Sequence, residues 1–134
     1  MKVVYDTCLY IDFFREKKYE DLFYNSRHIR YLSPIVLMEL RVGAILPESL
    51  KGLEMLFHAY EKAERIIDLS SVVYLKAGTV LQRILKKNGS IKKGLSHDVL
   101  IAFSAISMGA TLWTSNRSDF KMIQEHCPLK LEFL

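Results

Sequence analysis

The sequence predicts an α/β fold, in which a parallel sheet is covered by helices on both faces. Strand-like and helix-like segments follow one another along the whole chain, and this order is typical of a parallel sheet with helical connections. Residues 99–108 are almost entirely apolar, so a helix there must be covered on most sides. The apolar run 111–114 follows directly and indicates a strand that is buried on both faces.

The length and composition of the chain predict a single domain over residues 1–134. A net charge of +4 permits a phosphate-bearing partner but does not require one. The apolar runs are too short to span a membrane, and no signal-peptide pattern opens the chain. Cys8 and Cys127 lack metal-ligand or redox spacing, so we interpret them as reduced thiols of a cytoplasmic protein.

The first half of the chain begins with a β-rich run over residues 2–5, which predicts the first strand. A helix follows it and ends in a basic stretch, a short helix is expected over 19–26, and the alternation over 28–32 predicts a strand. Ser33 and Pro34 are typical of a helix start, with serine as N-cap and proline at the first position. That helix is expected to reach about residue 46, where Pro47 breaks it.

The second half continues the same alternation. We expect a helix over 50–64, a strand over 65–69 and a helix over 71–87 that stops at Asn88-Gly89. A buried helix is expected after Gly94, and a strand over 111–114 follows it. The chain then continues with a turn over 116–119, a helix over 120–126 and a strand over 129–133.

Polar residues are expected to meet at the carboxyl edge of the sheet, where open α/β sheets bind their ligands. Asp6 follows the first strand, and the turn containing Asn116 and Asp119 follows the strand over 111–114. The helices that carry Glu39 and Asp98 begin at the same edge. Four separate parts of the sequence are therefore predicted to converge on one crevice.

Glu39 is expected to lie on an apolar helix face, because Ile35 is four positions before it and Val42 three positions after it. An ionised carboxylate on a buried face is costly unless it is paired or binds a metal. The alternatives are a salt bridge to Arg41 or a lysine, or a solvated edge of the helix.

The other candidates also have structural interpretations. Asp6 can form a turn or cap the next helix, and Asp98 can satisfy free N–H groups at a helix start. Asn116 and Asp119 can simply shape their turn. These residues indicate function only as a set.

The chemistry of such a set is restricted. Several neighbouring carboxylates repel one another, and some would stay protonated without a cation. The ligands are oxygen atoms only, which favours Mg²⁺ or Mn²⁺ over Zn²⁺. Such an ion suits phosphoryl transfer, for which nucleic acid is the natural substrate.

Four motifs resemble those of PIN-domain ribonucleases, of the small kind found as the toxin in VapBC toxin–antitoxin pairs. They occur in the family's order over residues 3–12, 32–40, 97–102 and 112–120. The resemblance covers essentially the whole chain. It implies a three-layer α/β/α domain with a five-stranded parallel sheet of order 3-2-1-4-5, and Mg²⁺- or Mn²⁺-dependent cleavage of RNA.

The resemblance also assigns roles to individual residues. Asp6, Glu39 and Asp98 match the three invariant acids of the family and would hold the metal. Thr7 and Thr114 lie in the motifs as supporting residues, Thr114 matching a hydroxyl that commonly supports the first aspartate. Asn116 stands where many members have a fourth acid, and Asp119 matches an additional acid found in others. The amide at 116 removes one negative charge, which puts a second metal in doubt.

The resemblance implies a homodimer and a cognate antitoxin protein that blocks the crevice. Lys92, Lys93 and Arg117 could follow an RNA backbone, although each could equally belong to a solvated basic face. His97 is interpreted as a supporting or surface residue. The alternative function is a non-catalytic PIN-fold module that binds RNA or protein, which Asn116 keeps open. A haloacid-dehalogenase-type phosphatase would need a second Asp at position 8, where this chain has Cys8.

Overall fold

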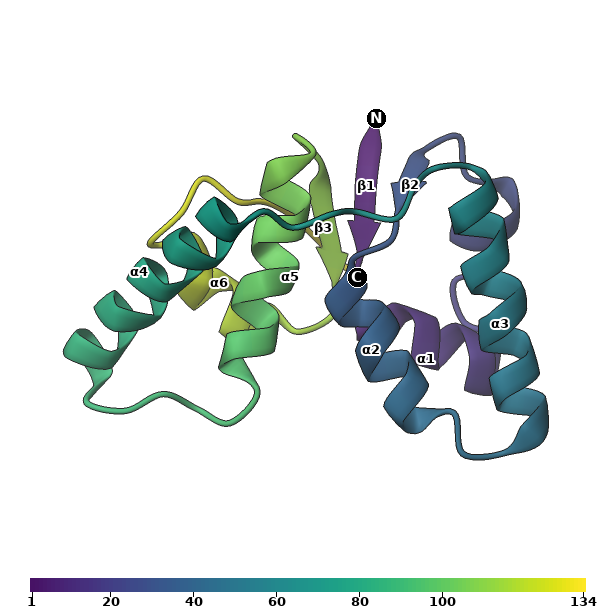
Figure 1. Cartoon of the computed structure of the whole chain (residues 1–134), viewed down its shortest axis with the longest axis horizontal. Helices are drawn as coiled ribbons and strands as arrows, with labels where there is room; N and C mark the ends of the chain where they lie inside the picture. The colour runs from purple at the N-terminus through teal and green to yellow at the C-terminus, as the bar shows by residue number, and fades with distance from the viewer.

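The structure is a computed structural model that describes the backbone of residues 1–134 and every side chain except that of Asn25. Its centre is a parallel sheet of four strands in the order β2-β1-β3-β4 (Figure 1). The strands are β1 (Lys2–Tyr5), β2 (Ile29–Tyr31), β3 (Thr111–Thr114) and β4 (Lys130–Phe133). Val3 pairs with Arg30 on one side and with Thr111 on the other, so β1 is central. The predicted fold class is confirmed.

The prediction of a strand over 65–69, which would have made a sheet of five strands, is wrong. Within the described backbone this segment forms only one isolated parallel bridge, between Leu32 and Ile66. The bridge lies beside β2, where the strand order 3-2-1-4-5 would place the third strand of the chain. Pairing ends at Leu32, because Leu32 is followed at once by Ser33, the N-cap of the next helix. Helix α3 (Pro47–Lys62) precedes the bridge. The sheet therefore has four strands.

Helices cover both faces of the sheet. Val3, Val4 and Tyr5 are consecutive and all buried, and successive residues of a strand point to opposite faces. Helix α5 (Leu95–Ser107) packs against β1 and β3, and α1 (Thr7–Glu16) packs against β3. The remaining helices are η1 (Asp21–Asn25), α2 (Pro34–Gly43), α4 (Ser71–Asn88) and α6 (Arg117–Gln124).

Two helix starts differ from the prediction. Pro47 does not merely end the preceding helix: it begins α3, because the first helical position needs no backbone N–H. Helix α6 begins at Arg117 and absorbs most of the expected turn 116–119, because the side chain of Asn116 caps it. Pro47 precedes Glu48, which lines a groove on the surface, and Arg117 follows Asn116, a candidate site residue.

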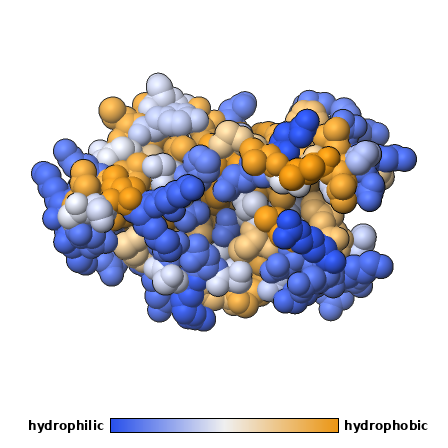
Figure 2. Space-filling model, turned by 90° about the horizontal axis from the view of Figure 1, so that it is seen from below, coloured by the Kyte–Doolittle hydropathy of each residue, from blue (hydrophilic) through white to orange (hydrophobic). Residues whose placement is uncertain are grey.

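The carboxyl ends of β1, β2 and β3 point the same way, toward the lower side of Figure 1. Helices α1, α2 and α6 begin directly after these strands, and α5 ends next to the start of β3, so its own first turn lies at the same edge. Seen from below, this side of the molecule is a mixture of hydrophilic and hydrophobic residues (Figure 2). No helix in the described part of the chain is long and apolar enough to cross a membrane.

Candidate active site at the carboxyl edge of the sheet

Asp6 is the most buried of the candidate carboxylates, with an exposed fraction of 5%. Its Oδ1 accepts a hydrogen bond from the backbone N–H of Thr7 at 2.8 Å, so the predicted capping role at α1 is confirmed. Its Oδ2 accepts a hydrogen bond of 2.7 Å from the buried hydroxyl of Thr114. Burial raises the pKa of Asp6, these hydrogen bonds oppose the shift, and the charge of Glu39 adds to it.

Glu39 is linked to the Asp6 region through Thr7, whose hydroxyl donates a 2.8 Å hydrogen bond to Oε1. The other oxygen, Oε2, lies 3.6 Å from Nδ1 of His97. These contacts replace the salt bridge to Arg41 that was one alternative. The expected apolar face is wrong at one position, because the side chain of Val42 is 77% exposed. Glu39 thus stands at the edge of the crevice, held by two residues that flank the other acids.

Asp98 lies in the first turn of α5 and is only partly buried. Burial and the charges of Asp6, Asp119 and Glu39 raise its pKa to about 7, and Lys92 partly offsets the shift. No side chain that the structure describes donates a hydrogen bond to its carboxylate. Four carboxylates from four parts of the sequence therefore act on one another, as expected of a converging set.

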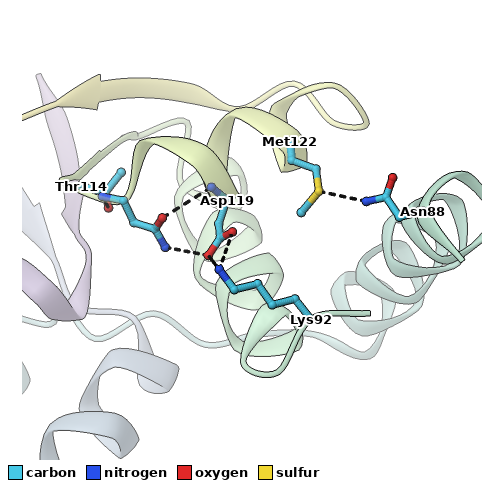
Figure 3. A network of polar contacts seen from close by, with 6 residues as sticks. Asn88, Lys92, Thr114, Asp119 and Met122 are labelled. Atoms are coloured by element: carbon cyan, nitrogen blue, oxygen red, sulfur yellow. Dashed lines mark hydrogen bonds and ion pairs between the residues drawn. The ribbon is translucent and has the colours of Figure 1, made fainter. Parts of the chain in front are cut away.

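Asn116 and Asp119 both shape the start of α6, and Asp119 lies beside Lys92 (Figure 3). The amide oxygen of Asn116 accepts from the backbone N–H of Asp119 at 3.5 Å, and its Nδ2 donates to Oδ2 of Asp119 at 3.0 Å. The backbone N–H of Asn116 donates to the Thr114 hydroxyl at 3.0 Å. Thr114 therefore connects this helix start to Asp6.

The three basic candidates have different surroundings. The ammonium of Lys92 lies 3.2 Å from both carboxylate oxygens of Asp119 (Figure 3). The guanidinium of Arg117 stands 4.4 Å from the ring centre of Phe133 on β4, a cation–π contact that turns it toward the strand. Lys93 is exposed. Lys92 is thus the candidate that the structure brings into contact with a site carboxylate.

The sequence analysis missed Cys8 as a neighbour of the site. Its Sγ lies 3.4 Å from Oδ2 of Asp6 and accepts a 3.2 Å hydrogen bond from the hydroxyl of Ser115. Both Cys8 and Cys127 are free thiols. The position of Cys8, two residues after Asp6 in the first turn of a helix, was a signal that could have placed it beside the carboxylate.

The chemistry of the site fits a hard divalent cation. The donors are carboxylate oxygens, and burial together with the charges of Asp6, Asp119 and Glu39 raises the pKa of Asp98, a cost that a cation beside it would relieve. Among the described residues, no three His, Cys, Asp or Glu side chains form a group that could hold a metal ion by themselves. Mg²⁺ ordinarily keeps several waters and uses one or two carboxylates, so it needs no such cage.

No protein-family model matches the sequence, and no curated protein matches it. Solved structures do match the fold over nearly the whole chain. VapBC2 from Rickettsia felis, bound to a DNA fragment from the promoter, is 27% identical, with 100% of this chain and 99% of that chain covered and a TM-score of 0.71.

Two further structures share the fold at lower identity. VapBC-1 from nontypeable Haemophilus influenzae is 23% identical, with 99% and 98% of the two chains covered and a TM-score of 0.72. FitAB bound to the IR36 DNA fragment is 18% identical, with 98% and 94% covered and a TM-score of 0.73. Together with the order of the four motifs, these matches confirm the resemblance inferred from the sequence: throughout its length the chain resembles a VapC-type PIN-domain toxin.

Proposed function

We propose that this protein is the toxin of a type II toxin–antitoxin pair and acts as a Mg²⁺- or Mn²⁺-dependent endoribonuclease. The observation that carries the proposal is the convergence of Asp6, Glu39 and Asp98 at the carboxyl edge, close enough for the charges of the first two to raise the pKa of the third. The likeness to VapBC and FitAB structures supports the toxin assignment.

The residues of the chain have distinct tasks in this proposal. Asp98 and Asp6, with Glu39 at the rim, would hold the cation directly or through water. When bound, the cation supplies positive charge to the phosphodiester and activates water as the nucleophile. Thr7 and Thr114 fix the orientation of Asp6, so its charge is already in place before substrate arrives.

Asp98 couples cation binding to proton release. In the metal-free protein its carboxyl group is partly protonated near neutral pH, because its pKa lies at about 7. A cation beside it would favour the ionised form, so cation binding would be accompanied by loss of the Asp98 proton. Hydrolysis by water would leave a 5′-phosphate and a 3′-hydroxyl.

The proposed function is tested with purified protein and end-labelled RNAs, structured and unstructured, in Mn²⁺, Mg²⁺ or EDTA. Asp6→Asn keeps an oxygen for the cap of α1 but removes the charge, so cleavage should fall by at least about a hundredfold, the typical loss on removing one transition-state contact. Glu54→Gln, at an exposed position of α3, is the matched control. Equal cleavage by the wild type and Asp6→Asn would indicate a contaminating nuclease.

The result can also favour the non-catalytic alternative, which Asn116 supports because it replaces an acid. A folded wild-type protein that binds no Mn²⁺ and cleaves none of the RNAs would overturn the nuclease. Retention of RNA on the same protein, measured by gel shift, would then identify a binding module.

An antitoxin and a second copy of the chain are the partners proposed. A groove of about 280 Å³ lies between α1, α2 and α3 and reaches Glu39, so a peptide bound in it would end at the site. Met38 and Val42 on α2 and Ile45 after it are exposed, which suits an apolar partner segment. We expect the product of a neighbouring antitoxin gene to inhibit cleavage when mixed with this protein. Sedimentation tests the homodimer.

A further inference from the structure

Lys92 is the one feature of the site that the motifs do not account for. It lies in the loop between α4 and α5, and its ammonium is 3.2 Å from both oxygens of Asp119. The Lys92 side chain is 66% exposed, whereas that of Asp119 is 13% exposed. The lysine therefore reaches from solvent to a mostly buried carboxylate, and its charged end is accessible from the crevice side.

Both carboxylate oxygens of Asp119 accept hydrogen bonds from neighbouring side chains. Its Oδ1 receives Lys92, and its Oδ2 receives both Lys92 and Nδ2 of Asn116. The amide oxygen of Asn116 is directed at the backbone N–H of Asp119 instead of the crevice. A second divalent cation would therefore have to compete with Lys92 and Asn116 for the oxygens of Asp119.

The charge of Lys92 also reaches the metal-binding acids. The charge of Asp119 raises the pKa of Asp98 and the charge of Lys92 lowers it, so both side chains lie near Asp98. A second divalent cation at this place would have to displace the ammonium from Asp119 and would then face an amide at position 116 where a carboxylate would attract it.

We propose that the Lys92 ammonium stands where a second divalent cation would otherwise be held, so that the site takes one divalent cation and Lys92 supplies the second positive charge to the scissile phosphate. The inference rests on the proposed nuclease function. A lysine ammonium is a compact charge on a flexible stem, suited to moving from Asp119 onto a phosphate oxygen. Lys92 would thus touch the substrate.

The test counts Mn²⁺ ions on the RNA-free protein by electron paramagnetic resonance, independently of any cleavage. The wild type should bind one Mn²⁺. Lys92→Met removes the charge but keeps an unbranched side chain, and it should bind two, because Oδ1 of Asp119 loses its donor and Oδ2 keeps only Nδ2 of Asn116. Lys92→Arg keeps a cation and should bind one. Lys62→Met, at an exposed position at the end of α3 and outside the four motifs, is the matched control and should also bind one.

RNA cleavage supplies the second readout. Lys92→Met should lower kcat by roughly tenfold to a hundredfold at limiting Mn²⁺, as expected when one charge on a transferring phosphoryl group is lost. Lys92→Arg should recover most of that loss, and Lys62→Met should change kcat less than about threefold. Circular dichroism confirms that each variant is folded.

Two outcomes overturn the inference alone: a wild type that cleaves RNA with two bound Mn²⁺, or a Lys92→Met variant that binds one Mn²⁺ like the wild type. A wild type that binds no Mn²⁺ and cleaves no RNA overturns the proposed function, and the inference with it. The two failures are therefore distinguishable in the same set of samples.

Discussion

Asp98→Asn should stabilise the metal-free protein at alkaline pH while it abolishes cleavage. Asp98 is a carboxyl group whose pKa is raised from 3.8 to about 7 on folding, mainly by burial and then by the charges of Asp6 and Asp119. The folded state therefore favours the protonated form. The cost of ionising Asp98 is absent below pH 3.8, grows as the pH rises toward 7 and is complete above it.

The size of the effect follows from the shift. About three pKa units correspond to ~4 kcal/mol at 1.36 kcal/mol per unit, and solvent screening of a partly buried carboxylate reduces this to about 1–2 kcal/mol. For a chain of this size each kcal/mol moves the melting temperature by about 4 °C. Asparagine has the same shape and cannot ionise, so Asp98→Asn should gain about 4–8 °C at pH 8.

The assay is thermal unfolding in EDTA at pH 5 and pH 8. The gain of Asp98→Asn over the wild type should be roughly a third as large at pH 5 as at pH 8, because pH 5 is about one unit above the unfolded pKa of 3.8 and about two below the folded pKa of about 7. Glu54→Gln, at an exposed position, should show no such pH-dependent difference. A gain that is equal at both pH values, or a loss at pH 8, would refute the electrostatic reasoning.

Three further predictions concern the same edge. Thr114→Val keeps the shape of the side chain but removes the hydroxyl that binds Asp6 and the start of α6. It should lower the free energy of unfolding by about 1–3 kcal/mol and slow cleavage, and an unchanged urea midpoint would contradict this prediction. Ser33→Ala removes a fully buried N-cap of α2 that also bonds the Ser104 hydroxyl at 2.8 Å, at a cost of about 1–2 kcal/mol in urea unfolding; a loss below about 0.5 kcal/mol would show that the cap is dispensable. Mn²⁺ at a hundred times its Kd should stabilise the wild type by about 2.7 kcal/mol at pH 8, and a similar gain in Asp98→Asn would place the ion elsewhere.

The sequence by itself determined the candidate acids and the edge on which they lie. Asp6 follows a strand, and Asn116 follows another; carboxyl ends of parallel strands meet at one edge, so their convergence follows from local patterns. The capping interpretation of Asp6 and its site interpretation both hold, because one oxygen caps α1 and the other is held by Thr114. Local sequence was sufficient here since strand ends and helix starts are local features.

Only the tertiary structure decided the contacts between these segments. The expected strand over 65–69 forms only one bridge, because its partner Leu32 is followed at once by the cap of α2. Lys92 and Asp119 are 27 positions apart and meet through the packing of the α4–α5 loop against α6. Arg117 lies within the site motif yet stands over Phe133. Such pairings depend on distances between elements, and periodicity along the chain contains no information about them.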